Sequence, residues 1–492
     1  MKPSEYASYD ATGLAALVKR GDVRPIELVE AAIARIEEHD GELNAVVDRW
    51  FDDARSRAES GALPEGPFAG VPFLLKDNGA FVAGRTAPQA SRLLAQVTRS
   101  TTGALVQRFD AAGLITLGRS NAPEFGIYGV TEPELYGACR NPWNTAHTPG
   151  GSSGGAGAAV AAGYVPVAHA GDGGGSIRIP ASHCGLVGLK PSRGRTPSSS
   201  PAPESWSGYV SEFAVTRSVR DAAALLDAVH GLSPGALYSA PASDRPFAAE
   251  VGADPGRLRI AFTTASLLGR DTAPENREAV ERAAALAESL GHEVAEACPR
   301  FDADALRKAY LMNVAANVAA LLEEAEAAAG RAARSDVELP TALLGLIGGA
   351  LTAGELVVSQ RMVQRANREV AAFFQDWDVL LTATTAQPPV LIGAFALSAG
   401  ERLMLRGLRR APLRAALMAA LDQMSGSAFD ATPNTQPFNQ TGQPAISLPL
   451  HMADGLPIGT QWVGRYGDEG TLIRLAAQLE ATESFTPLPA LD

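Results

Sequence analysis

The hydrophobic and polar positions of this chain switch between two periods along its length. Apolar residues recur every three or four positions over 9–40, which predicts two amphipathic helices. Short apolar runs near 72–76, 114–118, 165–168 and 378–381 predict buried strands. Because these strands alternate with helical segments, the pattern predicts a layered α/β domain.

The remaining helical patterns either belong to this α/β core or interrupt it. Within the core, helices are expected over 100–112, 156–162 and 217–230. An Ala-, Glu- and Arg-rich pattern of helical period predicts a helical insertion over about 250–375 that packs on the sheet. The segment at about 395–430 interleaves leucine and methionine with arginine. This pattern fits a candidate lid and, equally well, an ordinary surface helix with a basic face.

Composition narrows the classes of function. The 492 residues carry a net charge of −12, which argues against nucleic acids and anionic membranes as partners. Three scattered cysteines form no Cys-X-X-Cys pair, so no disulfide framework or metal site is expected, and a cytoplasmic location fits. No secretory signal is read after Met1, and the longest apolar stretch, 343–351, is too short and glycine-rich to span a bilayer.

Two glycine-embedded serines and one lysine are the strongest chemical signal. Ser152 lies in the run Gly150-Gly151-Ser152-Ser153-Gly154-Gly155, and Ser176 ends the run Asp172-Gly173-Gly174-Gly175-Ser176. Glycine runs allow the backbone to turn tightly and to aim several N–H groups at one point, which suits a developing oxyanion. Lys76 ends an apolar run, where burial lowers the pKa of a lysine and makes it a usable base. One buried lysine and two serines are enough for a hydrolase that uses no histidine.

These pieces, in this order, resemble the amidase signature family. The resemblance rests on Leu74-Leu75-Lys76-Asp77, the first glycine-serine run, a second serine 24 positions later, Ile177-Arg178-Ile179-Pro180 and the segment 438–449. It implies an α/β/α layered fold with a large mixed central sheet, as one amidase domain over 1–492 with a signature core at about 61–219. The family usually has threonine where this chain has Gly173. The Asp-Gly-Gly-Gly-Ser variant is most similar to the branch of cyclic nylon-oligomer hydrolases and their urethane-cleaving relatives.

The resemblance also implies a role for each of these residues. Ser176 is the expected nucleophile, Ser152 relays its proton, and a neutral Lys76 is the base. The peptide bond before Ser152 is cis in the family. Backbone N–H groups are expected to form the oxyanion hole, namely those of Gly173, Gly174, Gly175 and Ser176. The loop expected to line the substrate pocket contains Gly126, Ile127 and Tyr128.

The implied reaction is hydrolysis of amide or carbamate (urethane) carbon–nitrogen bonds through an acyl-enzyme intermediate. The expected substrate is a small, largely apolar molecule, because the lid candidate offers leucine and methionine rather than clustered polar groups. A monomer or homodimer is expected, with no cofactor, no metal, no nucleic acid and no membrane as partner.

Other interpretations of the same residues stay open at this point. The serines could merely satisfy their glycine loops, with Lys76 paired to Asp77. His169 and His183 flank Ser176 in sequence and allow a Ser-His-Asp site, but no apolar strand precedes the first glycine-serine run, as an α/β-hydrolase requires. A phosphate-binding loop fails because no Lys-Ser/Thr pair follows that run. A glutaminase or amidotransferase-type subunit that works beside a partner protein is a further alternative.

Overall fold

One large mixed sheet organises the molecule. The computed structural model describes residues 1–330, 336–482, 485 and 488–491. Eleven strands within these ranges form a single sheet in the order β1-β3-β2-β4-β6-β5-β10-β11-β9-β7-β8. Their bounds are β1 Val46–Arg49, β2 Pro72–Lys76, β3 Ile115–Ser120, β4 Val167–Asp172, β5 Val187–Lys190, β6 Ser211–Thr216, β7 Arg259–Phe262, β8 Glu293–Glu296, β9 Val379–Ala383, β10 Ala445–Ala453 and β11 Leu456–Gly464. Strands β3, β2 and β4 pair in parallel, as do β9, β7 and β8, and every other neighbouring pair is antiparallel.

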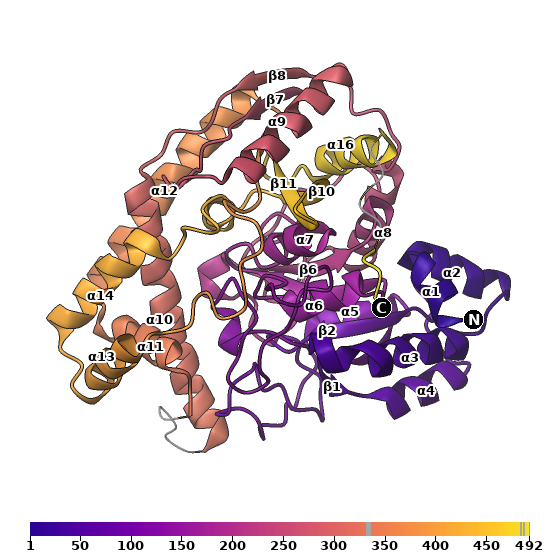
Figure 1. Ribbon diagram of the computed structural model, residues 1–492, viewed down its shortest axis with the longest axis horizontal. Coiled ribbons are helices and arrows are strands. Elements are labelled where there is room, and N and C mark those ends of the chain that lie inside the picture. Colours follow the sequence, from indigo (N-terminus) through magenta and orange to yellow (C-terminus); the bar gives the residue numbers. More distant parts are fainter. Residues whose placement is uncertain (331–335, 483–484, 486–487, 492) are drawn as a thin grey trace.

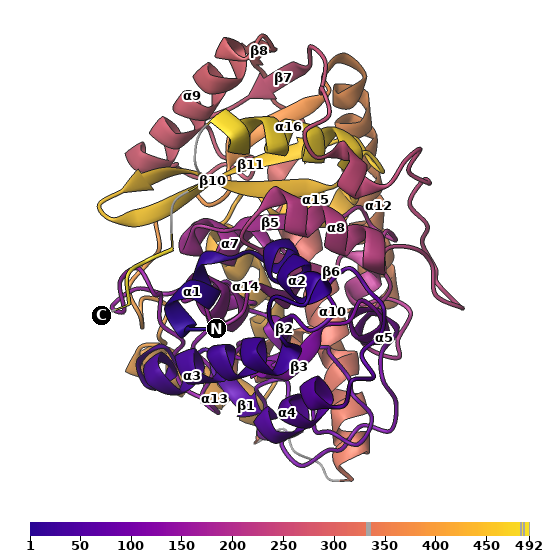
Figure 2. The ribbon, with the colours of Figure 1, turned by 90° about the vertical axis from the view of Figure 1, so that its right-hand side faces the viewer.

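Helices cover the sheet, as Figures 1 and 2 show from two directions. Those in the described ranges are α1 Pro3–Ser8, α2 Ala11–Arg20, α3 Pro25–Leu43, α4 Phe51–Glu59, α5 Ala104–Ala111, α6 Gly154–Ala161, α7 Arg178–Cys184, α8 Val219–Val229, α9 Pro274–Ser289, α10 Ala303–Ala329, α11 Leu339–Ala350, α12 Ala353–Asp376, α13 Ala399–Arg410, α14 Arg414–Ser427, α15 Gln436–Thr441 and α16 Glu469–Thr482. Single 3₁₀ turns occur at η1 Glu124–Gly126, η2 Trp206–Gly208 and η3 Phe247–Glu250. The layered α/β fold and its mixed sheet are confirmed.

The parallel pairing of β2 with β4 brings distant segments of the sequence together. Phe73 lies opposite Val167, and Leu74 lies opposite Ala168. Parallel neighbours end at the same edge of a sheet, so Lys76 and Asp172, the last residues of these strands, emerge side by side. Helix α6, built only of Gly, Ala and Val and buried throughout, begins directly after Ser153 at this edge.

The segment 250–375, expected to be a helical insertion, also contributes two strands. Strand β7 pairs with β9, and β8 pairs with β7 to form the end of the sheet. The segment expected to be a helical insertion is therefore largely helical but not helical throughout. Both strands are only four residues long, and three residues of β8 are exposed, so they carry no alternating apolar pattern that the sequence could display.

Helices α10, α11, α13 and α14 gather at one side of the molecule, on the left of Figure 1. They enclose a second hydrophobic cluster, here called the outer core, which includes Tyr209, Tyr310, Leu417, Leu421 and Phe429. The candidate lid segment is thus a pair of helices, α13 and α14, packed on α10 and α11. Among the described residues no single helix meets the length and apolarity needed to cross a membrane, and α11 and α12 meet it only as a pair bent by 103°.

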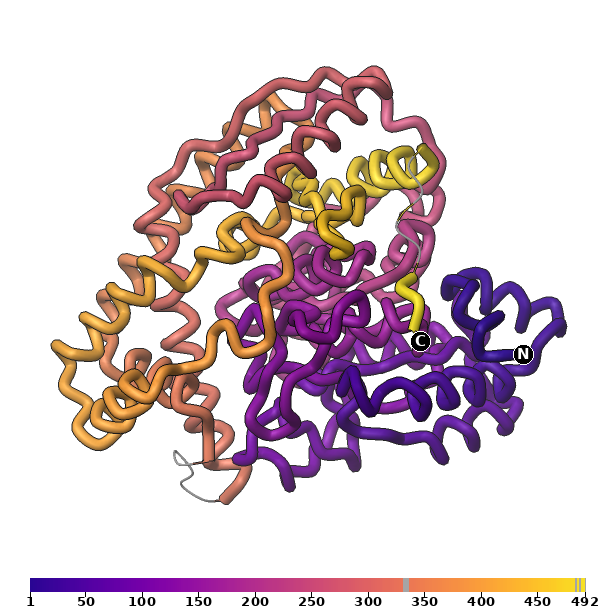
Figure 3. Tube along the Cα trace, in the orientation of Figure 1, coloured from indigo at the N-terminus to yellow at the C-terminus, as the bar shows by residue number. Residues whose placement is uncertain are grey.

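Figure 3 follows the trace to the chain ends, which lie on the same side of the molecule. Leu491 packs against the main hydrophobic core, which also contains Tyr6 and Leu14 of the first two helices. This side is remote from helices α13 and α14 (Figures 1 and 3).

Candidate active site

Lys76 and Ser152 form a direct hydrogen bond at the edge of the sheet. The Lys76 ammonium nitrogen donates to Ser152 Oγ over 2.7 Å and lies 3.5 Å from the carbonyl oxygen of Gly171. The Gly151–Ser152 peptide bond is cis, as the resemblance implies. Gly151 packs directly against Val130, because a Cβ atom on residue 151 would come within 2.7 Å of the Val130 backbone. The lysine and Ser152 are both almost fully buried.

Burial lowers the pKa of Lys76 to about 7, an effect that the carboxylates of Glu212 and Asp172 partly oppose. In a large share of the molecules the Lys76 amine is therefore neutral near pH 7 and able to accept a proton. Asp77 does not pair with Lys76, because its carboxylate accepts hydrogen bonds from the Ala90 N–H at 2.8 Å and the Tyr136 hydroxyl at 3.1 Å. The alternative in which Lys76 only neutralises Asp77 therefore does not match the geometry.

Asp172 organises the second glycine loop from inside. Its carboxylate accepts hydrogen bonds from the backbone N–H of Gly175 at 2.7 Å and of Ile177 at 3.2 Å, and it forms an ion pair with Arg178 at 2.8 Å. Asp172 and Arg178 are both fully buried. Burial alone raises the pKa of Asp172, but the Arg178 guanidinium outweighs it and holds that pKa at about 2. The loop is therefore folded around a buried negative charge.

Arg178 joins this loop to the C-terminal third of the chain. Its guanidinium donates to Gln461 Oε1 at 2.6 Å, to Asn439 Oδ1 at 2.7 Å and to the carbonyl oxygen of Thr435 at 3.0 Å. Asn439 in turn donates to the Asp172 backbone and side chain. Each donor of the buried ion pair finds an acceptor, which is the condition under which such a pair is tolerated in a protein interior.

The backbone N–H groups of the loop differ in whether they have a partner. Those of Gly173, Gly174 and Ser176 make no hydrogen bond to any described residue, whereas that of Gly175 is taken by Asp172. The expectation that all four amides form an oxyanion hole is therefore corrected, because Gly175 has no free donor in this conformation. Three amides and the hydroxyl of Ser176, which is 8 % exposed, remain available.

Two residues that sequence reasoning missed hold the carbonyl groups of this loop. The Tyr310 hydroxyl donates to the Gly173 carbonyl at 3.1 Å, and Thr435 Oγ1 donates to the Gly174 carbonyl at 2.7 Å. A peptide plane is rigid, so fixing each carbonyl also fixes the direction of the following N–H. Tyr310 lies in α10 and Thr435 precedes α15, more than 100 residues away, and no local motif marks either of them.

The predicted pocket residues lie at the end of the short turn η1 and directly after it. Gly126, at a φ of 70°, packs so closely that a Cβ atom there would lie 3.2 Å from Ser152 Oγ. Ile127 packs against the outer core. Tyr128 is half-buried, and burial raises the pKa of its phenol. The structure thus brings Gly126 to the serine–lysine pair and directs Ile127 toward an apolar region.

The two histidines near Ser176 in sequence do not bond to a serine of the site. His169 is buried, its Nδ1 accepts from the Lys76 backbone N–H at 3.3 Å, and burial lowers its pKa to about 3. His183 is also buried, with a pKa lowered by burial to about 3. In the described part of the chain neither imidazole is hydrogen-bonded to Ser152 or Ser176, so a Ser-His-Asp arrangement does not match the geometry.

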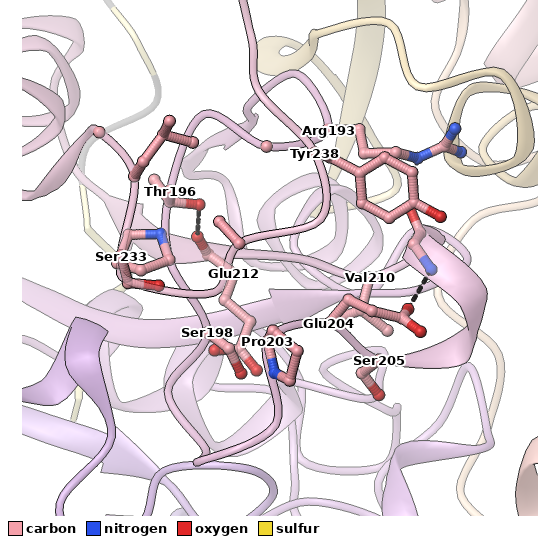
Figure 4. A pocket seen from close by; sticks show the side chains of 16 residues that line it. Arg193, Thr196, Ser198, Pro203, Glu204, Ser205, Val210, Glu212, Ser233 and Tyr238 are labelled. Atoms are coloured by element: carbon pink, nitrogen blue, oxygen red, sulfur yellow. Dashed lines mark hydrogen bonds between the residues drawn. The ribbon is translucent and has the colours of Figure 1, made fainter.

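A pocket lies beside the loop that carries Trp206. Figure 4 shows Glu204 and Glu212 among its lining side chains, together with Ser198, Ser205 and Tyr238.

The space that a side chain at Gly173 would occupy is taken instead by the indole of Trp206 and by Val210. Glycine replaces the family's usual threonine at position 173, and Trp206 and Val210 occupy the space that the threonine side chain would need.

Comparisons with known proteins establish the family and agree with the fold. The amidase family model matches residues 27–473. The 6-aminohexanoate-cyclic-dimer hydrolase of Pseudomonas sp. (strain NK87) is 40% identical over 485 residues, which cover 96% of this chain and 94% of that protein. A solved structure of 6-aminohexanoate cyclic dimer hydrolase superposes with a TM-score of 0.88 at 37% identity, covering 97% of each chain. A bacterial aryl acylamidase superposes with a TM-score of 0.84 at 26% identity over 96% of each chain.

The family match spans most of the chain, and the matched structures share its sheet and its surrounding helices. The chain belongs to the amidase signature family and is a hydrolase of amide carbon–nitrogen bonds.

Proposed function

We propose that the chain hydrolyses small amides and carbamates through an acyl-enzyme on Ser176, with Ser152 as proton relay and Lys76 as base. The observation that carries this proposal is the 2.7 Å hydrogen bond between Lys76 and Ser152. A lysine with a pKa of about 7 exchanges protons readily at neutral pH, which is the property a general base needs. The free amides of Gly173, Gly174 and Ser176 support the same role for the neighbouring loop.

The proposed reaction has two halves. In the first, Ser176 Oγ attacks the carbonyl carbon while its proton passes to Ser152 and the Ser152 proton passes to Lys76. The carbonyl oxygen becomes an oxyanion that accepts hydrogen bonds from the free loop amides. Collapse of this intermediate breaks the carbon–nitrogen bond, and the departing nitrogen takes the proton back through the relay. In the second half, water attacks the acyl-enzyme by the same route and releases the acid and free Ser176.

The proposed substrates carry an apolar group next to the scissile bond. Ile127 and Trp206 both pack on the outer core, which is built from aromatic and aliphatic side chains. Burial of apolar surface contributes about 25 cal/mol per Å², so an aryl group on the substrate gains affinity there. The names of two relatives, a 6-aminohexanoate-cyclic-dimer hydrolase and an aryl acylamidase, support a small amide as substrate. A carbamate presents the same carbonyl geometry, but its resonance makes the carbon less electrophilic, so slower turnover is expected.

The lid role of 395–430 belongs to the same proposal. Leu417, Leu421 and Phe429 of this segment are buried in the outer core. Phe429 packs edge-on against Tyr310 at 5.3 Å, and Tyr310 donates to the Gly173 carbonyl. One aromatic side chain, that of Tyr310, therefore separates Phe429 from the candidate oxyanion loop, which supports a role of this segment in covering the acyl pocket.

Turnover of acetanilide by the purified chain alone tests the proposal. We expect Ser176→Ala and Lys76→Ala to remove nearly all turnover while folding is kept, with exposed Ser289→Ala and Lys19→Ala as matched controls that retain it. A covalent serine-directed inhibitor should label the peptide that contains Ser176. Turnover by a folded Ser176→Ala variant, or labelling elsewhere, contradicts the nucleophile. A need for a second protein would favour the amidotransferase-type alternative.

A further inference from the structure

The indole of Trp206 lies directly against Gly173, one of the loop residues with a free backbone amide. A Cβ atom built on Gly173 would come within 2.8 Å of Trp206 Cε3 and 2.9 Å of its Cζ3, and within 3.1 Å of Val210 Cγ2. Any side chain at position 173 would have to displace the ring. The close approach of the indole to this residue therefore depends on glycine.

Hydrogen bonds hold the backbone of the turn that carries Trp206. Trp206 and the next residue, Ser207, have φ angles of 53° and 55°, a left-handed conformation that non-glycine residues adopt only where their surroundings impose it. Asn313 of α10, itself buried, donates to the Trp206 carbonyl at 2.8 Å, and the Glu204 carboxylate accepts from the Gly208 N–H. The backbone that carries Trp206 is thus fixed by specific contacts, which set the starting point of its side chain beside Gly173.

Trp206 also packs beside a group of aromatic side chains next to the loop. Tyr209 stacks on Tyr310 with ring centroids 5.9 Å apart, and Tyr310 meets Phe429 edge-on at 5.3 Å. Trp206 packs on this outer core but is only partly buried, so part of its ring remains uncovered. A partly uncovered aromatic ring beside Gly173 is suited to a flat apolar group bonded to a carbonyl that this loop receives.

We propose that Trp206 is a specificity-determining residue that contacts an aryl group attached to the scissile amide or carbamate. The inference rests on the proposed function of the Gly173 loop, because it places the substrate carbonyl at that loop. It goes further by naming the side chain that selects the substituent. Trp206 takes part in no bond-making step; its ring improves binding of the flat group and excludes water from the Gly173 amide.

The ratio of kcat/KM for acetanilide to that for acetamide measures this selectivity. We expect Trp206→Ala to lower the ratio roughly tenfold, mainly through a higher KM for acetanilide, and Trp206→Phe to keep most of it. Trp377→Ala is the matched control, since Trp377 is half-buried against Phe373 and belongs to a different hydrophobic cluster. An unchanged ratio in folded Trp206→Ala would overturn the inference.

A second variant pair tests the contact without relying on one large truncation. Gly173→Ala should push the indole aside, lower the melting temperature and reduce the acetanilide preference. In the Trp206→Ala background the same substitution should have little further effect on either quantity, because the ring it displaces is gone. Equal effects of Gly173→Ala in both backgrounds would show that the two residues do not compete for this space.

A binding measurement separates failure of this inference from failure of the proposed function. Acetanilide affinity is measured by calorimetry on Ser176→Ala and on Ser176→Ala/Trp206→Ala, where no turnover is needed. Roughly tenfold weaker binding by the double variant supports Trp206 even if wild-type enzyme fails to hydrolyse acetanilide. Equal affinities overturn the inference even if hydrolysis by wild type is fast.

Discussion

Replacement of Lys76 by methionine should abolish turnover and yet stabilise the folded protein at neutral pH. The lysine ends a fully buried strand, and burial lowers its pKa from 10.5 to about 7. An unfolded chain solvates the ammonium group freely and keeps the ordinary pKa. Folding therefore works against the preferred charge of this side chain, and methionine, of similar length but without charge, removes the conflict.

The size of the effect follows from the pKa difference. Each pKa unit corresponds to about 1.4 kcal/mol, so a fall from 10.5 to about 7 destabilises the folded state by roughly 5 kcal/mol at pH values below 7. Between pH 7 and 10.5 the unfolded chain binds more protons, so this penalty shrinks as pH rises and vanishes above 10.5. Loss of the hydrogen bond to Ser152 costs about 1–3 kcal/mol. The net gain expected for Lys76→Met is about 2–4 kcal/mol at pH 7.

Urea unfolding of wild type and Lys76→Met at pH 7 and pH 9 measures both the gain and its dependence on pH. The advantage of the variant should fall by roughly 2–3 kcal/mol between the two pH values, because the wild type recovers stability as its unfolded lysine loses charge. Lys19→Met, at an exposed helical position, is the control and should show no such pH dependence. A variant less stable than wild type by the same amount at both pH values would refute the argument that Lys76 is held neutral by burial.

Three further outcomes are expected. The kcat/KM of wild type should fall about tenfold per pH unit below pH 7 and level off above it, since only the neutral lysine accepts a proton; a folded His169→Gln variant should keep this profile, and a profile flat from pH 5 to 9 would contradict it. Arg178→Gln should lower the free energy of unfolding at pH 7 by about 3–5 kcal/mol, because it leaves the Asp172 charge buried without its partner, and a loss below about 1 kcal/mol in urea titration would contradict this. Acetanilide should be turned over faster than an N-phenyl carbamate, and acetamide should be the slowest of the three. The Phe429→Ala substitution in the 395–430 segment should reduce these differences in rate. Equal rates for all three substrates, unaltered by the variant, would mean that the segment is only a surface element.

The sequence by itself determined the local parts of this protein. Apolar runs predicted β2 and β9 and helical periods predicted α2, α3 and α8, because burial of one face imposes a repeat that neighbouring residues must show. The lysine at the end of β2 and the two glycine-serine runs were readable for the same reason, since tight turns and close backbone approach require glycine at particular positions.

Only the tertiary structure decided which groups of these segments are free to act. The Asp172 carboxylate takes the Gly175 amide, and Tyr310 and Thr435 orient the peptides on either side of Gly174 from more than 100 residues away. Trp206 fills the space beside Gly173, and the exposed strand β8 joins the sheet without an apolar pattern. Apart from the local bond between Asp172 and Gly175, these contacts depend on the packing of elements distant in sequence, and a single hydrogen bond or ring contact across such a distance leaves no periodic trace in the chain.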